Sequence, residues 1–380
     1  MIIAGGTICS ENRQIKNGAI EIEGKKIKVI YNNVDDLEVD MHIDDDALII
    51  PGAIDTHIHG ANSFDTMDAT FESLEGLSNY LPSTGTTSFM PTTMTTDISS
   101  INNALNNVYQ YQEEVSGACI IGVHLEGPFI SPVYPGAQDP KHIMKPTHNH
   151  LNSLVSKYPG LIKQITFAPE EVEDTSFYQL INDNGIVPSF GHTNATADQL
   201  KKTRINKATH LYNAMRPLHH RELGVVGYSL MNDDIDIELI VDGIHITEDV
   251  VHFTYKSKSN ERIILITDSM RAAGLSDGDY DLGGQPVYVK DQKATLQDGT
   301  IAGSTLTMNQ ALKNMHRYTQ CDINALIEMS ATNPAKLFNL YDRKGSISVG
   351  KDADLVIYDQ NFKVLYTFVE GQLVYTSKEN

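Results

Sequence analysis

Eight short apolar segments recur along the middle of the chain, and polar stretches with helical periodicity separate them. The apolar segments are Leu48–Asp55, Thr87–Pro91, Cys119–Leu125, Ile165–Ala168, Ile186–Phe190, Lys207–Leu211, Ile237–Val241 and Ile263–Thr267. The helix-like stretches include Phe71–Leu81, Ile98–Gln112, Thr175–Asn184, Thr196–Lys202 and Thr247–Tyr255. Continuous apolar strands that alternate with helices are typical of parallel strands buried on both faces. The pattern therefore predicts an α/β fold built on a (β/α)8 TIM barrel, with its active site at the C-terminal ends of the strands.

A doubly wound sheet is the main alternative to this barrel. That fold would place a glycine-rich phosphate-binding turn after an early strand. No G-x-G-x-x-G occurs in the chain. The absence of this turn favours the barrel.

The two ends of the chain show a different pattern, rich in short strands. Gly18–Ile30 alternates around a Gly-Lys turn, and Asp352–Ser377 contains strand-like pieces broken by turn residues. Neither end is long enough to bury a core alone. We therefore predict a small β-sandwich domain built from residues 1–50 and 346–380, with the barrel at 51–345. Within the barrel, the Gly- and Asp-Gly-containing stretch Leu275–Gly303 predicts an excursion over the mouth.

The composition excludes several classes of protein. Lys and Arg number 29 against 49 Asp and Glu, a formal net charge of −20, which argues against a nucleic-acid-binding surface. The chain has no apolar stretch long enough to span a membrane and no signal-peptide pattern at its start. Its 3 cysteines show no paired spacing, so no disulfide framework is expected. We expect a cytoplasmic protein whose partners include neither nucleic acid nor membrane.

Chemically active residues fall where the predicted strands end. They are His57, His59, Glu126, His192, His210 and Asp268. His57 and His59 share one face of a strand because side chains alternate with period two. Each residue alone could be structural, but a single metal-dependent hydrolase site at the C-terminal end of the barrel explains all of them. Nitrogen and oxygen ligands without thiolate suit Zn²⁺, Fe²⁺, Mn²⁺ or Co²⁺, and a bound metal would activate water and polarise a carbonyl. Asp268 is then the candidate catalytic acid/base.

Several motifs at these positions are similar to those of a known group of enzymes. They are PGAIDTHIHG (51–60), HLEGPF (124–129), GHTNA (191–195), THLYNAM (209–215), DGIH (242–245), TDSMRAAG (267–274), AGSTLTM (302–308) and KGSISVGKDADLVI (344–357). With these motifs the chain resembles the amidohydrolase superfamily, and within it the N-acetylglucosamine-6-phosphate deacetylase family. The likeness covers nearly the whole chain. It implies hydrolysis of N-acetyl-D-glucosamine 6-phosphate to D-glucosamine 6-phosphate and acetate, in amino-sugar catabolism and cell-wall recycling.

The resemblance also implies roles for individual residues. Glu126, His192 and His210 match the main metal site, while His57 and His59 match ligands of members that bind a second metal, so one or two ions are expected. Asp268 matches the general acid/base. The residues that match substrate-binding positions are Ala137, Gln138, Asn213, Ala214, Arg221 and His245. Arg221 matches a residue that reaches the neighbouring active site in many members, which implies a homodimer. Gln138 replaces a histidine found in some members, so we expect it to hydrogen-bond substrate.

Two other hypotheses about function would use the same residues differently. One is a cyclic-amide hydrolase or deaminase on the same barrel; many such enzymes place a metal-bridging lysine on the fourth strand, and ITFAPE (165–170) offers none at its end. A non-catalytic sugar-phosphate-binding protein would be expected to lose ligands or the acid/base, and all are present. We expect His124 to be structural and His219-His220 to lie on a loop surface.

Overall fold

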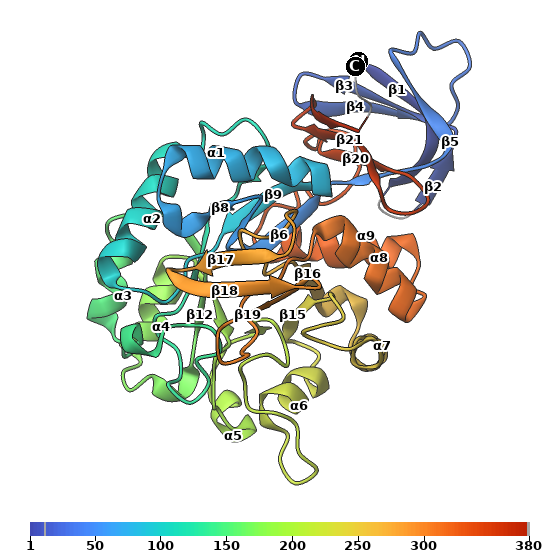
Figure 1. The fold of residues 1–380 in the computed structure, drawn as a ribbon. Coiled ribbons are helices and arrows are strands. Elements are labelled where there is room, and N and C mark those ends of the chain that lie inside the picture. Colours follow the sequence, from blue (N-terminus) through green and yellow to red (C-terminus); the bar gives the residue numbers. More distant parts are fainter. Residues whose placement is uncertain (11–12, 378–380) are drawn as a thin grey trace.

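The computed structural model describes residues 1–10 and 13–377, and parallel strands occupy its centre (Figure 1). One sheet has the order β10–β9–β6, and a six-stranded sheet has the order β11–β12–β13–β14–β15–β16. The bounds are β6 (Ala53–Ile58), β9 (Thr86–Pro91), β10 (Cys119–Ile120), β11 (Val123–Glu126), β12 (Ile162–Phe167), β13 (Val187–Phe190), β14 (Lys207–Ala208), β15 (Asp236–Ile240) and β16 (Ile263–Ile266). All pairings within these two sheets are parallel. Every predicted apolar segment therefore contributes a strand.

Backbone contacts join the two sheets at both of their edges. Between β16 and β6, the N–H of Asp268 donates to the carbonyl of His57 at 2.9 Å. On the other side, Thr92 forms a parallel bridge with His124, and the N–H of Thr93 donates to the carbonyl of His124 at 3.1 Å. These backbone contacts thus connect the two sheets.

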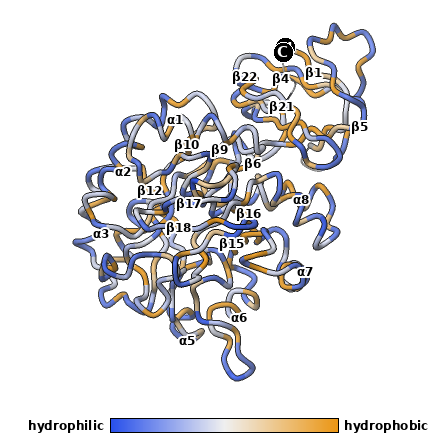
Figure 2. The backbone as a smooth tube through the Cα atoms, viewed as in Figure 1, coloured by the Kyte–Doolittle hydropathy of each residue, from blue (hydrophilic) through white to orange (hydrophobic). Residues whose placement is uncertain are grey.

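Helices surround these strands (Figure 1). They are α1 (Phe71–Tyr80), α2 (Ile98–Tyr111), α3 (His148–Val155), α4 (Ser176–Asp183), α5 (Ala197–Leu200), α6 (Gly224–Met231), α7 (Glu248–Ser257), α8 (Met308–Thr319), α9 (Ile323–Ile327) and α10 (Asn333–Leu337). Polar side chains start several of them: Thr70 caps α1 and Asp97 caps α2 by accepting from backbone N–H groups. Along α2 and α8 hydrophobic and hydrophilic residues alternate (Figure 2), as expected when one face packs on the core.

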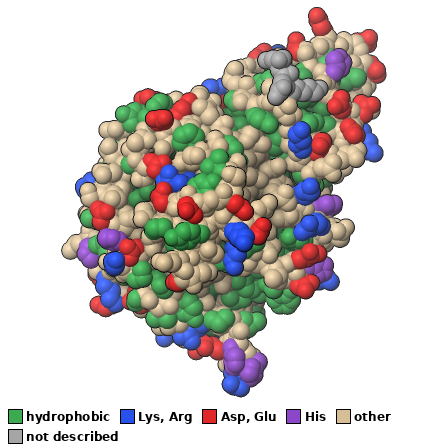
Figure 3. All heavy atoms as spheres, in the orientation of Figure 1, with side chains coloured by type: hydrophobic (Ala, Val, Ile, Leu, Met, Phe, Trp, Pro, Cys, Tyr) green, Lys and Arg blue, Asp and Glu red, His purple; other side chains and the backbone are tan. Residues whose placement is uncertain are grey.

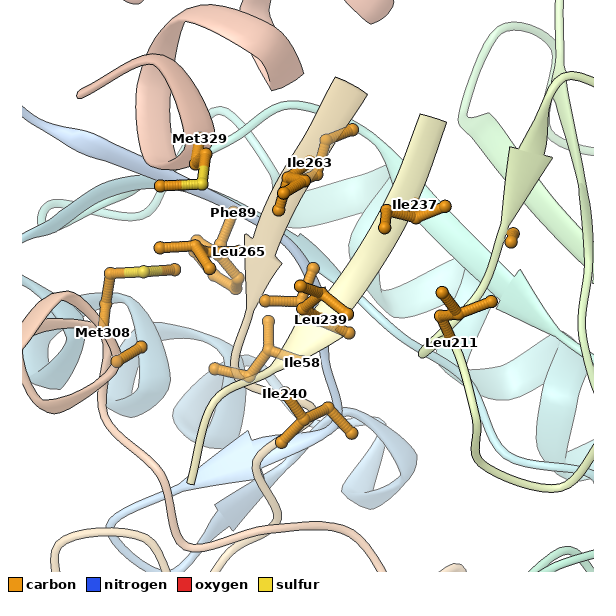
Figure 4. Packing of buried hydrophobic residues seen from close by; sticks show 14 of the residues in the cluster. Ile58, Phe89, Leu211, Ile237, Leu239, Ile240, Ile263, Leu265, Met308 and Met329 are labelled. Carbon is orange, nitrogen blue, oxygen red and sulfur yellow. The ribbon is translucent and has the colours of Figure 1, made fainter. Parts of the chain in front are cut away.

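Apolar side chains of the central strands are packed in a buried core (Figure 4). Ile237 and Leu239 of β15 and Leu265 of β16 are fully buried, and Met308 of α8 packs in the same cluster. Because side chains alternate along a strand, Glu238 must lie on the opposite face of β15. This places a charged residue on the face of β15 opposite Ile237 and Leu239.

Both ends of the chain build one separate sheet, which lies beside the main body (Figure 1). Its order is β22–β21–β20–β5–β1–β3–β4, with β2 paired to β1. The bounds are β1 (Ile2–Ser10), β2 (Arg13–Lys16), β3 (Ala19–Glu23), β4 (Lys26–Tyr31), β5 (Met41–Pro51), β20 (Leu355–Tyr358), β21 (Val364–Val369) and β22 (Gln372–Thr376). Ile8, Ile49 and Phe368 belong to a core of its own. The two layers of a sandwich stay a prediction, because these strands form a single hydrogen-bonded sheet.

Two of the predicted segments are each divided between two strands. Leu48–Asp55 is wrong as one strand, since β5 ends at Pro51 and β6 begins at Ala53. Pro51 has no N–H to continue a ladder, and the N–H of Gly52 donates instead to Asp354 O at 3.0 Å. Cys119–Leu125 is divided at Gly122, whose φ of +128° suits glycine.

The stretch Leu275–Gly303, predicted as an excursion, forms a small antiparallel sheet. It comprises β17 (Gly278–Leu282), β18 (Gln285–Lys290) and β19 (Lys293–Thr295), while a two-residue pair, β7 (Gly60–Ala61) and β8 (Phe64–Asp65), follows β6. Leu282 and Ile301 line the cavity described below, so this excursion covers the strand ends. Within the described residues, no helix combines the length and apolar character needed to cross a membrane.

Candidate functional site

The predicted metal ligands converge at the C-terminal ends of the central strands. His57 and His59 come from the end of β6, Glu126 ends β11, His192 follows β13 and His210 follows β14. All five are buried, with at most 5% of each residue exposed. His192 and His210 have φ values of 46° and 30°, a left-handed conformation that is uncommon for residues other than glycine. Such backbone strain is often found at functional sites.

Glu126 lies at the centre of this group. Its Oε1 is 3.5 Å from His57 Nε2, 3.2 Å from His192 Nε2 and 3.1 Å from His210 Nε2. Its Oε2 is 3.2 Å from His59 Nε2. One carboxylate therefore faces all four imidazoles. Among the described residues this gives two sets with metal-binding geometry, His57–His59–Glu126 and Glu126–His192–His210, which share Glu126.

The close packing of these donor atoms fits a divalent cation. The Nε2 atoms of His192 and His210 are only 3.1 Å apart, and both face the same carboxylate oxygen. The Nε2 of His57 is buried and has no hydrogen-bond partner among the described residues. Nitrogen lone pairs and carboxylate oxygens held this closely need a positive charge between them. The donor set contains no thiolate, which suits Zn²⁺, Fe²⁺, Mn²⁺ or Co²⁺.

Three of the imidazoles have their other ring nitrogen held by an acceptor. Nδ1 of His59 lies 3.2 Å from Thr92 O, and Nδ1 of His192 lies 3.2 Å from Tyr134 O. Nδ1 of His57 lies 3.1 Å from Glu238 Oε2. An acceptor at Nδ1 fixes the hydrogen there and leaves Nε2 free to bind a metal.

Asp268 completes the group from the end of β16. Its Oδ1 is 3.2 Å from His59 Nε2 and 3.4 Å from His57 Nε2. Burial would raise the pKa of Asp268, but the charges of these histidines hold it below its usual range. The pKa of Glu126 is likewise well below its usual range, because His57, His192 and His210 outweigh the effect of burial. Both carboxyl groups are therefore ionised at neutral pH.

A cavity of about 240 Å³ opens onto these groups. Five of the six predicted substrate-binding residues line it: Ala137, Gln138, Asn213, Ala214 and His245. Gln138 is held in place, since its Oε1 accepts from Thr95 N at 2.6 Å and its Nε2 donates to Glu126 Oε2 at 2.9 Å. Nδ1 of His245 lies 2.7 Å from Asp242 Oδ2, which orients its Nε2.

Arg221, the sixth, does not line the cavity of its own chain. It lies exposed on the loop between β14 and α6, which extends away from the body (Figure 1). Histidine and basic side chains gather at the end of this projection (Figure 3). His219 and His220 are exposed there, as expected for a loop surface, with ring centroids 4.0 Å apart. His124 is buried on β11 and hydrogen-bonds Thr166 at 2.7 Å, in keeping with a structural role.

The sequence interpretation missed three buried polar residues below the metal ligands: Gln164, Lys207 and Glu238. The ammonium of Lys207 and the amide of Gln164 both donate to Glu238 Oε1. Burial alone would raise the pKa of Glu238, but Lys207 and His57 hold it well below its usual range. Burial lowers the pKa of Lys207. The available signal was a glutamate in the apolar strand DIELIV, at positions 236–241.

Comparison with known proteins agrees with this geometry. The model of the amidohydrolase family matches residues 48–374. The chain belongs to the amidohydrolase family. It is 42% identical to the N-acetylglucosamine-6-phosphate deacetylase of Bacillus subtilis (strain 168), over 100% of this chain and 98% of that protein. The confirmed family agrees with the metal-hydrolase interpretation of the strand ends.

Two solved structures share the fold. The crystal structure of N-acetylglucosamine-6-phosphate deacetylase from Thermotoga maritima has a TM-score of 0.90 and 36% identity, covering 99% of this chain and 100% of that one. The Mycobacterium smegmatis deacetylase, as an aspartate-to-alanine variant in complex with N-acetyl-D-glucosamine 6-phosphate, has a TM-score of 0.93 and 26% identity over 99% of each chain. The fold is therefore that of a mixed α/β amidohydrolase with a second, smaller domain.

Proposed function

We propose that this protein hydrolyses N-acetyl-D-glucosamine 6-phosphate to D-glucosamine 6-phosphate and acetate. The observation that carries the proposal is the arrangement of one acid, Asp268, beside four imidazoles and Glu126 at the base of a cavity. This arrangement occurs in a chain 42% identical to a deacetylase of that name. The reaction belongs to amino-sugar catabolism and cell-wall recycling.

His57, His59, Glu126, His192 and His210 would hold the divalent metal, as one or two ions. Bound there, a metal would lower the pKa of water and polarise the amide carbonyl of the substrate. The two arcs of strands, which backbone hydrogen bonds join at both edges, would form one (β/α)8 barrel. A closed barrel would keep the donor groups at fixed separations, because they come from the ends of four strands, β6, β11, β13 and β14.

Asp268 would carry the proton through the reaction. It takes a proton from the attacking water while the new C–O bond forms, and then gives it to the nitrogen as the C–N bond breaks. Asp268 lies next to His57 and His59, and the positive charge that they would hold would keep it ionised, and hence able to accept, before the reaction begins. The proton count is balanced, since the leaving amine receives what the water lost.

Substrate binding would rely on local cations rather than on overall charge. His245, Asn213, Ala214, Ala137 and Gln138 line the cavity and would contact the sugar and its phosphate. Arg221 of the partner subunit would complete the phosphate site in a homodimer in the cytoplasm, since the arginine fork binds phosphate well. The exposed position of the Arg221 loop in the single chain supports this role.

The deciding experiment measures acetate released by purified, metal-loaded protein. N-acetyl-D-glucosamine 6-phosphate is expected to be hydrolysed, and N-acetyl-D-glucosamine without phosphate to react with a much lower kcat/KM, because remote binding energy positions the amide. Absence of acetate from the phosphorylated substrate would overturn the proposed function. Equal rates for the two substrates would overturn the phosphate-binding roles of Arg221 and His245.

A further inference from the structure

A buried carboxylate lies behind the metal ligands, and the reaction proposed above makes no use of it. Glu238 is fully buried on β15. Its Oε1 accepts from Lys207 Nζ and from Gln164 Nε2, the latter at 2.9 Å. Its Oε2 lies 3.1 Å from His57 Nδ1 and accepts from the backbone N–H of His210 at 3.3 Å. These four donors use the hydrogen-bonding capacity of the carboxylate, and Lys207 balances its charge.

This arrangement determines which nitrogen of His57 carries hydrogen. An ionised carboxylate only accepts hydrogen bonds, so Nδ1 of His57 must donate. The lone pair is then on Nε2, which faces Glu126 and Asp268. His59 and His192 donate to backbone carbonyls instead. Among these three imidazoles, His57 alone depends on a charged side chain from another strand.

We propose that Glu238 is a positioning residue for His57, and that Lys207 is its fixed counter-charge. Glu238 holds the ring so that Nε2 points into the position formed with His59 and Glu126. The same carboxylate also accepts from the backbone N–H of His210, a member of the second candidate metal set, Glu126–His192–His210. The inference rests on the proposed metal centre.

Replacing Glu238 by glutamine creates a conflict that the structure makes specific. With the amide oxygen toward Lys207, the NH2 group faces His57 Nδ1 and moves the ring hydrogen to Nε2. With the oxygen toward His57, the NH2 group faces the lysine ammonium, donor against donor. Glu238→Gln is therefore expected to weaken Zn²⁺ binding about 10- to 100-fold. Calorimetric titration of chelator-stripped protein with Zn²⁺ measures this affinity. The His57→Ala variant gives the affinity expected when the His57 ligand is absent.

A double variant separates hydrogen-bond direction from general damage to the fold. In Lys207→Met/Glu238→Gln no ammonium remains, so the amide oxygen can face His57. Gln164, whose Oε1 has no hydrogen-bond partner in the described structure, can turn its own amide to accept from the new NH2 group. The double variant is expected to recover most of the wild-type Zn²⁺ affinity. Asp354→Asn is the matched control, because it alters another buried carboxylate paired with a lysine, Lys344, far from the cavity.

The outcomes distinguish this inference from the proposed function. Wild-type Zn²⁺ affinity in Glu238→Gln overturns the inference, as does a double variant that binds no better than the single one. If Glu238→Gln does not fold, the double variant decides: affinity like the wild type supports the inference, and affinity like His57→Ala overturns it. Acetate release by the wild-type protein is a separate measurement, and its absence would overturn the proposed function.

Discussion

Replacing Asp268 by asparagine tests the proposed proton transfer with little disturbance of the backbone. Asp268 has a φ of 48°, in the left-handed region that asparagine and aspartate tolerate better than other side chains. Its N–H donates to His57 O at 2.9 Å and its carbonyl accepts from Ser304 N at 2.8 Å. Asparagine preserves this backbone geometry and removes the negative charge together with the ability to accept and release a proton. Alanine would add a backbone cost of about 1–2 kcal/mol.

The surroundings of Asp268 set the expected size of the effect. A general acid/base contributes about 10²- to 10⁴-fold to a rate, or about 2.7–5.4 kcal/mol at 1.36 kcal/mol for each factor of ten. Glu126, the other carboxylate in the cavity, is already engaged by imidazoles and by Gln138. It is therefore a poor substitute, and we expect kcat to fall by about 10³- to 10⁴-fold, toward the upper end of that range.

The assay follows acetate release from N-acetyl-D-glucosamine 6-phosphate at saturating substrate, with elemental analysis of bound metal in each preparation. Asp65→Asn is the control, because Asp65 is a buried aspartate that caps a short helix outside the cavity lining. Asparagine also caps helices well, so this variant should keep wild-type kcat. Turnover by Asp268→Asn within tenfold of the wild type, at equal metal content, would refute the assignment.

Three further predictions concern other parts of the molecule. Arg221→Met and Asp268→Asn should each be nearly inactive alone. Dimers reassembled from an equal mixture should recover about a quarter of wild-type activity, since half are mixed and each mixed dimer has one complete site; no recovery would contradict action across subunits. Lys344→Met removes the cation 2.6 Å from buried Asp354 and should lower the free energy of unfolding by about 3–5 kcal/mol in urea denaturation. The half-exposed Lys28→Met should have no measurable effect, and equal effects would contradict the burial argument. Burial lowers the pKa of Lys258 from 10.5 to about 8. The unfolded chain therefore binds more protons between these values, and stability should rise with pH across that window. Lys258→Met should lack this increment when urea midpoints at pH 8 and 10 are compared, and an unchanged increment would refute the cause.

The sequence predicted which polar residues lie close together better than it predicted the exact strands. The proximity of His57, His59 and Asp268 could be expected because the C-terminal ends of parallel strands meet at one edge, and these ends are visible as the last residues of apolar segments. The division of Leu48–Asp55 could not be found this way, because Ile49 and Ile54 are both buried and apolar. Their different sheets are determined by contacts with distant strands.

The supporting residues were missed for a similar reason. Glu238 and His57 are separated by 181 positions in the sequence, and Lys207 lies 31 positions from Glu238. Lys207 stands at the start of an apolar segment, where a solvent-facing lysine is the ordinary expectation. Only the arrangement of the strands shows that both charges are enclosed together. Likewise, no pattern in the sequence indicates that Gln138 donates to Glu126.

The sheet shared by both ends of the chain has a consequence for synthesis. β5 pairs with β1 on one side and with β20 on the other, so its second edge remains open until residues 355–358 have left the ribosome. By then the central strands are already outside the exit tunnel. During most of its translation the nascent chain therefore exposes an edge strand with unpaired N–H and C=O groups. Such an edge can pair with a neighbouring chain. Chaperones that bind such edges should matter most late in synthesis. A chain truncated before β20 should aggregate even though every residue of the candidate site is present.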